Sequence, residues 1–287
     1  MATFTNQATL SYNDAIINSN TVTGEIVDPI TVTKNAGTAS YNTNDIVPYS
    51  ISLVNTGATP YNGLTVTDNL GEYTVAGTPA QTYVPLTYVP DSVRYYVNGV
   101  LQATPTVTGQ SPLTITGINV PAGGNAVILF SARPNRFAPL GTAARINNTV
   151  SVTGAGFVDP LTANAAIPVA TGAALTITKS LNPTTTTSNG QITYTFVIAN
   201  NGPTAVTAAD TAAITDTFNP RLTITGVTFN GTSWAEPTNY TYNAQTGEFS
   251  TVQGGITVPA ATYAQNPVTG EWTVTPGTST LVVTGNI

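Results

Sequence analysis

The sequence predicts an all-β fold made of two tandem immunoglobulin-like antiparallel sandwiches. Three observations carry this prediction: the composition, a two-residue alternation of apolar side chains, and an internal repeat. Only 7% of the 287 residues are charged, and threonine makes up roughly a fifth of the chain. Threonine, valine, isoleucine and tyrosine favour strands, and the 25 glycines and 20 prolines separate the strand-like runs.

Apolar side chains alternate with serine and threonine in the clearest strand-like runs. The residues in phase are Tyr49, Ile51 and Leu53 in one run and Tyr194, Phe196 and Ile198 in another. A strand of this kind has one buried and one solvated face, which is typical of an antiparallel sandwich.

A set of landmarks occurs twice in the same order. The first copy is ITVTK (30–34), YSISLVNTG (49–57) and LTVTDNL (64–70), and the second is LTITK (175–179), YTFVIANNG (194–202) and AAITDTF (212–218). Because the landmarks recur in order, they form an internal repeat. We expect one module over residues 30–172, a second over residues 173–287, and a separate segment over residues 1–29.

The N-terminal segment matches the last strand of the first module. Aligning Asn6 with Asn148 places Phe4 on Ile146, Ala8 on Val150 and Leu10 on Val152. The second module reaches Ile287 without a counterpart of the Asn148 strand. The N-terminal segment therefore has the sequence of a last strand that precedes any module, and the second module lacks its own last strand. An incomplete sandwich exposes a sheet edge and an apolar groove, which a donated strand can fill.

We therefore expect residues 1–29 to complete the second module of another copy, with Phe4, Ala8, Leu10 and Tyr12 as the donated side chains. The link after Val27 has only a few residues, so it cannot span the length of the first module and reach the second module of the same chain. Such a contact between copies does not close on itself, so it generates a fibre.

The composition argues against most other classes of protein. A net charge of −6, with two lysines and five arginines, gives no basic stripe for nucleic acid or for an anionic membrane. There is no histidine and no cysteine, so we expect no metal site, no cofactor and no enzyme activity. No apolar run is long enough to span a membrane, and residues 1–10 do not have the pattern of a signal peptide.

Both lysines of the chain occupy the same point of the repeat. Lys34 and Lys179 each lie in phase with the apolar residues of their strands, and a buried ammonium needs a partner. The same phasing puts Asp68, Asp216, Asn148 and Asn6 on apolar faces. Asn55 and Asn200 precede turns, where asparagine is an ordinary turn residue.

These landmarks carry a family resemblance. A lysine closing the first strand, followed by Y-x-I-x-L-x-N-x-G, V-x-D and N-T-x-S-V, resembles the bacterial surface repeat known as the conserved repeat domain of unknown function number eleven. The second module departs from it, because it lacks its own N-T-x-S-V strand and has Asn200 and Asn201 where one asparagine is usual. The resemblance implies immunoglobulin-like modules in tandem, an extracellular location on a cell or spore surface, and a pilin-like or spore-appendage-like subunit.

The lysine, acid and asparagine pattern is also similar to the pilin and adhesin modules that form a Lys–Asn isopeptide bond. This similarity implies a bond between Lys34 and Asn148 assisted by Asp68, and a bond between Lys179 and Asn6 of the next subunit assisted by Asp216. The alternative is a buried, non-covalent Lys–Asp pair in each module, with the asparagines capping strand ends.

The expected function is that of a structural subunit of an extracellular filament, whose partners are copies of itself, with any tip or anchor protein unknown. The alternative is a tandem adhesin or spacer that is a fragment of a larger surface protein. A glycan-binding shelf at Trp234 and Trp272, or a glycosidase pair among Glu236, Glu248 and Glu271, ranks below both, because these side chains have no convergent partners.

Overall fold

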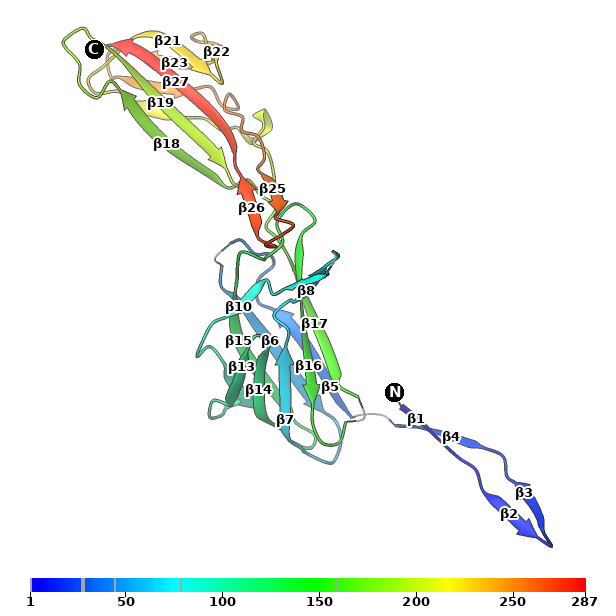
Figure 1. The fold of residues 1–287 in the computed structure, drawn as a ribbon. Coiled ribbons are helices and arrows are strands. Elements are labelled where there is room, and N and C mark those ends of the chain that lie inside the picture. The colour runs from blue at the N-terminus through cyan, green and yellow to red at the C-terminus, as the bar shows by residue number, and fades with distance from the viewer. Residues whose placement is uncertain (1, 27–28, 44, 78, 158) are drawn as a thin grey trace. The chain divides into compact units, whose positions relative to one another are not determined.

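The structure is a computed structural model that describes residues 2–26, 29–43, 45–77, 79–157 and 159–287. In these ranges the regular elements are antiparallel β-strands and one short 3-10 turn, η1 (Ala208–Asp210) (Figure 1). The prediction of an all-β fold is confirmed. No helix within these ranges has the length and apolarity needed to cross a bilayer.

The chain divides into two compact units. The first comprises Met1–Pro139 and Arg145–Pro168, and the second comprises Leu140–Ala144 and Val169–Ile287. The division therefore falls at Pro168, four residues before the boundary predicted after residue 172. We call the first unit from Ile30 onward module 1, the second unit module 2, and residues 2–26 the arm.

The arm is a long two-stranded hairpin that pairs only with itself among the described residues. Its strands are β1 (Ala2–Asn6), β2 (Thr9–Tyr12), β3 (Ala15–Asn18) and β4 (Val22–Ile26). Strand β1 pairs with β4 and β2 pairs with β3, around a turn in which Asn13 and Asp14 both have positive φ. Asparagine and aspartate tolerate that conformation better than most residues, which explains the position of the turn.

Module 1 is a sandwich of two sheets. Its first sheet has the order β12-β11-β15-β6-β5, with β10 also paired to β15, and its second has the order β13-β14-β7-β16-β17. The strands are β5 (Ile30–Ala36), β6 (Val47–Asn55), β7 (Tyr61–Asp68), β10 (Leu86–Tyr88), β11 (Arg94–Val97), β12 (Val100–Leu101), β13 (Thr106–Gln110), β14 (Leu113–Val120), β15 (Asn125–Pro134), β16 (Arg145–Thr153) and β17 (Leu161–Pro168), and β8 (Tyr73–Val75) and β9 (Gln81–Tyr83) form a separate hairpin. The core comes from alternate residues of both sheets, among them Ile51, Leu53, Val66, Phe130 and Val152.

Module 2 repeats the first sheet of module 1, except that β10 has no counterpart. Its sheet order is β18-β19-β27-β21-β22, which corresponds to β5-β6-β15-β11-β12. The strands of module 2 are β18 (Leu175–Asn182), β19 (Gln191–Asn200), β20 (Thr215–Thr217), β21 (Thr223–Phe229), β22 (Thr232–Ser233), β23 (Tyr240–Asn243), β24 (Glu248–Thr251), β25 (Thr262–Gln265), β26 (Trp272–Thr275) and β27 (Gly277–Asn286). The β25-β26 pair is a hairpin outside both main sheets.

The second sheets of the two modules differ by one hairpin. In module 2 this sheet has the order β20-β24-β23, which corresponds to β7-β14-β13. Module 1 continues past β7 with β16 and β17, and β17 also packs beside β5. Among the described residues, nothing in module 2 occupies the corresponding place, so the outer edges of β18 and β20 are unpaired.

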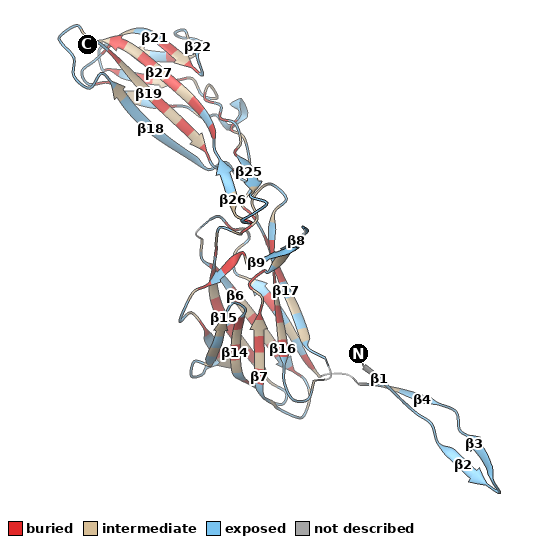
Figure 2. Cartoon of the chain, viewed as in Figure 1, coloured by how far each residue is buried: buried red, intermediate tan, exposed pale blue. Residues whose placement is uncertain are grey.

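Burial follows this difference in strand content. Strand β5 buries Ile30 and Lys34, whereas every residue of β18 except Leu181 is exposed (Figure 2). The first strand of module 2 thus has the sequence of a buried strand without the cover that would bury it.

Candidate functional site

The candidate site of module 1 is a buried ion pair between its two sheets. Lys34 lies on β5 in phase with Ile30, and Asp68 closes β7 in phase with Leu64 and Val66. Lys34 Nζ lies 2.5 Å from Asp68 Oδ2, and the side chains are 0% and 1% exposed. The Lys34 ammonium also faces the rings of Tyr49 and Phe130, at 5.2 and 5.9 Å from their centroids.

Burial shifts the proton equilibria of this pair toward the neutral forms. Loss of hydration lowers the pKa of Lys34 from 10.5 to about 8, and the charge of Asp68 only partly opposes that shift. Burial also raises the pKa of Asp68, although Lys34 and the N–H of Leu70 act in the opposite direction. A neutral amine beside a protonated carboxyl is therefore accessible at the site.

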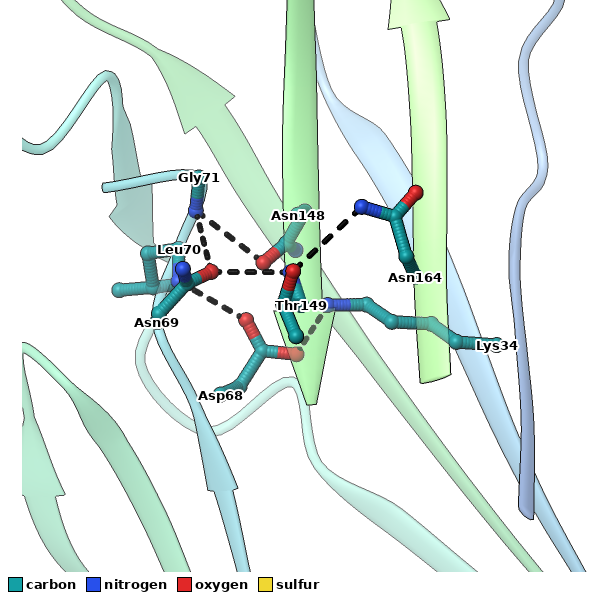
Figure 3. Close-up of polar contacts among 8 residues, drawn as sticks. All are labelled: Lys34, Asp68, Asn69, Leu70, Gly71, Asn148, Thr149 and Asn164. Carbon is teal, nitrogen blue, oxygen red and sulfur yellow. Dashed lines mark hydrogen bonds and ion pairs between the residues drawn. The ribbon is translucent and has the colours of Figure 1, made fainter. Parts of the chain in front are cut away.

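Asn148 completes the site from β16 (Figure 3). Its side chain is fully buried, and its Oδ1 accepts a hydrogen bond of 3.1 Å from the N–H of Gly71. Its Nδ2 donates no hydrogen bond, and neither does the buried hydroxyl of Tyr49. Asn148 nevertheless lies close enough to Asp68 and Tyr49 to influence the pKa of each. A buried amide nitrogen without an acceptor is costly in a finished core.

The turn after β7 positions both Asp68 and Asn148. The N–H of Leu70 donates to Asp68 Oδ1 at 3.0 Å, and the N–H of Gly71 donates to Asn148. Gly71 has a φ of +77°, and a Cβ there would lie 2.5 Å from Ile146 Cγ2. Only glycine allows β16 to approach this turn so closely.

This arrangement can do one kind of chemistry. A neutral lysine amine is a nucleophile, a protonated carboxyl can polarise an amide carbonyl, and an asparagine side chain supplies the electrophilic carbon. The structure brings together the three residues that the sequence analysis grouped in module 1.

Module 2 contains the same lysine and acid without the asparagine. Lys179 on β18 forms an ion pair with Asp216 on β20. The ammonium lies 4.4 Å from the ring centroid of Tyr194 and 5.4 Å from those of Phe196 and Phe218. Unlike the pair in module 1, it is open to solvent, with Lys179 39% and Asp216 19% exposed.

An apolar groove lies beside this open pair. It has a volume of about 190 Å³ and is lined by side chains that include Leu175, Ile177, Ile198, Ala212, Ile214 and Ile256. Leu175 and Ile177 are 46% and 53% exposed. By the alignment of β7 with β20, Ile214 corresponds to Val66, whose partner in module 1 is the fully buried Val152 of β16. The groove is the place that β16 fills in module 1.

The arm presents one apolar face to solvent. Residues directly opposite in an antiparallel pair lie on the same side of the ladder. This rule groups Phe4, Asn6 and Val22 in the β1-β4 ladder, and Leu10, Tyr12 and Ile17 in the β2-β3 ladder. The even-numbered alternation from Phe4 to Tyr12 joins these two groups into one face, with Thr3, Thr5, Ser11 and Ile16 on the other. Every one of the five apolar residues on the first face is at least 54% exposed. The predicted donor residues Phe4, Leu10 and Tyr12 thus share this face, while Ala8 lies at the break between β1 and β2.

The arm is an antiparallel hairpin, as is the β16-β17 hairpin that module 2 lacks, although their pairings are not identical. Asn6 lies opposite Val22 in the arm, and Asn148 lies opposite Ala165 in the β16-β17 hairpin. In both hairpins the strand that follows the turn leads into the first strand of a module. Asn6 lies on β1 of the arm, and its equivalence to Asn148 rests on the sequence alignment.

Asn55 and Asn200 have a structural role. Asn55 donates to the carbonyls of Thr59 and Pro121 and accepts from the N–H of Gly57. Asn200 makes the equivalent contacts in module 2. All their buried polar atoms are used, so neither is available as an electrophile.

The aromatic rings around the lysines and the N–H donors of the turn were not predicted from the sequence. Tyr49 and Tyr194 stand at equivalent positions of the repeat, and that recurrence was the available signal. Phe130 on β15 and Phe218, just after β20, could not be assigned in this way, because the tertiary fold decides which residues they contact.

Comparison with known proteins gives a likeness to surface proteins of bacteria. The major pilin subunit of Bacillus cereus matches 94% of this chain and 70% of its own, with 12% identity and a TM-score of 0.36. The pilus backbone of Streptococcus pneumoniae matches 86% of this chain with 12% identity and a TM-score of 0.35, and the match spans 55% of that protein. A fragment of the major pilin of Streptococcus agalactiae matches 87% of this chain and 91% of its own, with 14% identity and a TM-score of 0.34.

These values are too low to carry a functional conclusion. No family model matches the chain, and no curated protein sequence matches it either. The resemblance to the conserved repeat domain therefore stays a prediction, and the function is inferred from the chain's own residues.

Proposed function

We propose that the chain is a structural subunit of an extracellular filament, in which the arm of one copy completes module 2 of the next. One observation carries the proposal: the two main sheets of module 2 repeat those of module 1 without the β16-β17 hairpin, and the arm is an exposed hairpin with an apolar face whose sequence aligns with β16. The partner is a second copy, and the location we infer is a cell or spore surface.

The energetics favour docking of the arm. A two-stranded hairpin alone is at best marginally stable in water. Burying its five exposed apolar side chains against the groove would contribute on the order of 10 kcal/mol before the costs of ordering and association. Strand pairing to β20 would also satisfy an edge that is unpaired in the described residues.

The connectivity of module 1 favours a contact between different copies. The chain enters module 1 at Pro29, whose carbonyl accepts from the N–H of Thr56 after β6. It leaves at Pro168, whose carbonyl accepts from the N–H of Tyr41, beyond the far end of β5. Entry and exit therefore lie at opposite ends of module 1. Repeating this connection from copy to copy gives a head-to-tail contact that does not close.

The Lys34–Asp68–Asn148 centre fits the same role. We propose that Lys34 and Asn148 form an amide with loss of ammonia, which would tie β5 to β16 and remove the orphaned Nδ2. A covalent tie between the first and last strands would resist extension of the module under load. Loss of one ammonia from the intact mass of a Lys179→Arg chain, and its absence in the Lys34→Arg, Lys179→Arg double variant, would test this bond.

The register of docking gives a sharp test of the filament proposal. In module 1, Ser151 of β16 pairs with Thr67 of β7. The corresponding residues are Thr9 of the arm and Thr215 of β20, so their Cα atoms should lie within disulfide range between copies. The chain has no natural cysteine. A Thr9→Cys, Thr215→Cys variant should oxidise into disulfide-linked multimers, detected on a non-reducing gel.

The control for this test shifts one cysteine along the same strand. A Thr9→Cys, Thr217→Cys variant keeps the chemistry but moves the acceptor two residues, to a diagonal position beyond easy disulfide reach. Equal cross-linking of both variants would contradict the proposed register. Monomers of the wild-type chain in electron micrographs at all concentrations would contradict the filament and favour the adhesin or spacer.

A further inference from the structure

The Lys179–Asp216 pair is an open version of the module 1 centre. In module 1 the lysine, acid and asparagine come from β5, β7 and β16 of one chain. In module 2 the first two are present, held against three aromatic rings, and the third is missing from the described residues of that module. The arm carries Asn6, which the sequence alignment matches to Asn148.

We infer that Lys179 of one copy and Asn6 of the next form an amide bond once the arm has docked, with Asp216 as the acid that assists it. The inference rests on the proposed function, because Asn6 reaches Lys179 only if the arm fills the groove. The site is thus divided between two subunits: one copy supplies Lys179 and Asp216 from module 2, and the next supplies Asn6 from its arm.

The register places the reacting groups. In module 1, Val150 pairs with Asp68, and Asn148 lies two residues before it on the same face. In the docked arm, Ala8 would pair with Asp216 and Leu10 with Ile214, which leaves Asn6 at the position of Asn148. Lys179, which already pairs with Asp216, would then be brought next to Asn6.

The chemistry needs no further reactant. The neutral amine of Lys179 attacks Cγ of Asn6, and the protonated carboxyl of Asp216 donates a hydrogen bond to the carbonyl oxygen. Asp216 then transfers a proton from the amine to Nδ2. A new Cγ–Nζ bond forms, the Cγ–Nδ2 bond breaks, and ammonia leaves.

Docking itself would switch the reaction on. Before docking, the Lys179–Asp216 pair is in contact with water. Docking would remove that water, and loss of hydration favours the neutral forms that the reaction needs. The arm would cover the pair with Phe4, Ala8 and the rest of its apolar face, as β16 and β17 cover Lys34 and Asp68. Lys179 of an isolated subunit would therefore not react with other amide groups, and the bond would form only where the arm of another copy has docked.

The test is carried out on filaments of the full chain, boiled in detergent and separated on a denaturing gel. The wild-type protein should give a ladder of multiples of the chain mass, with one ammonia lost per junction in the mass spectrum and a cross-linked peptide containing Lys179 and Asn6. The Asn6→Ala, Lys179→Arg and Asp216→Asn variants should still form filaments visible by electron microscopy. After boiling in detergent, these filaments should run as monomers on the gel.

Two control variants separate this bond from other effects. Asn18→Ala removes an amide from the opposite strand of the arm and should keep the ladder. Lys34→Arg removes only the candidate bond within module 1 and should also keep it. Retention of the ladder in the Asn6→Ala variant would overturn the inference.

The outcomes distinguish the inference from the function on which it rests. Wild-type filaments that dissociate completely into monomers on boiling would refute the covalent bond and leave strand donation standing. Failure of the wild-type chain to form any filament would refute both.

Discussion

Modules 1 and 2 have the same lysine and acid at the same points of the same sheet order, yet the two pairs differ in exposure. The pair in module 1 is sealed by β16 and β17, whereas the pair in module 2 is open. Sequence alone therefore does not determine what a Lys–Asp pair does. The strands that cover it decide whether it is a surface ion pair or a buried group with displaced pKa values.

The largest expected contrast between the modules is the cost of removing the lysine. In chains without residues 2–26, Lys34→Ala would leave Asp68 buried without its partner, and we expect module 1 to lose about 3–5 kcal/mol. Lys179→Ala removes a solvent-exposed pair and should cost about 1 kcal/mol or less. Urea unfolding measures both.

Two spectroscopic signals assign these losses. Both tryptophans, Trp234 and Trp272, lie in module 2, so their fluorescence follows that module, while far-ultraviolet circular dichroism follows both. The Lys34→Ala variant should lower the urea midpoint of the module 1 transition, which circular dichroism detects and tryptophan fluorescence does not. Equal losses from the two substitutions would show that the cover of β16 and β17 is not what separates the pairs.

A smaller contrast is the pH dependence of module 1. In an Asn148→Ala variant, which has no amide to form, Lys34 would lose its proton near pH 8 when folded and near pH 10.5 when unfolded. The unfolded state binds more protons between these values, so the unfolding free energy should rise with pH there, by up to about 3 kcal/mol. The raised pKa of Asp68 has the opposite effect, a fall in stability as pH rises above about 4.

Urea midpoints across pH 4–11 would measure this dependence. Adding Lys34→Met to the Asn148→Ala variant removes the titrating amine and should abolish the rise above pH 8. A rise that persists in the double variant would assign the effect to another group.

The two faces of the arm give the smallest contrast. Leu10 lies on the face that we dock into module 2, at the position of the fully buried Val152, and Ile16 lies on the other face. Leu10→Ala should weaken assembly by about 2 kcal/mol, or roughly 30-fold in the critical concentration. Ile16→Ala removes a similar exposed side chain and should change it little, as sedimentation of filaments would show. A stronger effect of Ile16→Ala would mean that the arm docks through its other face.

Much of the fold could be predicted because strand alternation is a local property. The runs beginning at Ile30 and Leu175 are β5 and β18, and the in-phase residues Tyr49, Ile51 and Leu53 are buried as expected. The placement of Lys34, Asp68 and Asn148 on inward faces followed from the same period of two.

Other features depended on long-range pairing. Alternation at Phe4, Ala8, Leu10 and Tyr12 indicated a donated strand. It could not show that residues 2–26 fold back on themselves as one hairpin, because that pairing depends on the turn at Asn13 and Asp14. Val27, after which the short link was expected, lies outside the described residues. The phase of Lys179 likewise predicted an inward face without revealing that the face is uncovered.

Complementation between two half-defective chains tests strand donation most directly. A chain without residues 2–26 keeps an open module 2 but has no arm to donate. An Ile177→Lys chain keeps its arm, but a charge in the groove should block its own module 2, at a position exposed enough not to harm the monomer. Light scattering should show each variant alone as a monomer and their equimolar mixture as a dimer that grows no further. Persistence of monomers in that mixture, while the wild-type chain polymerises, would contradict donation of the arm to module 2 of another copy.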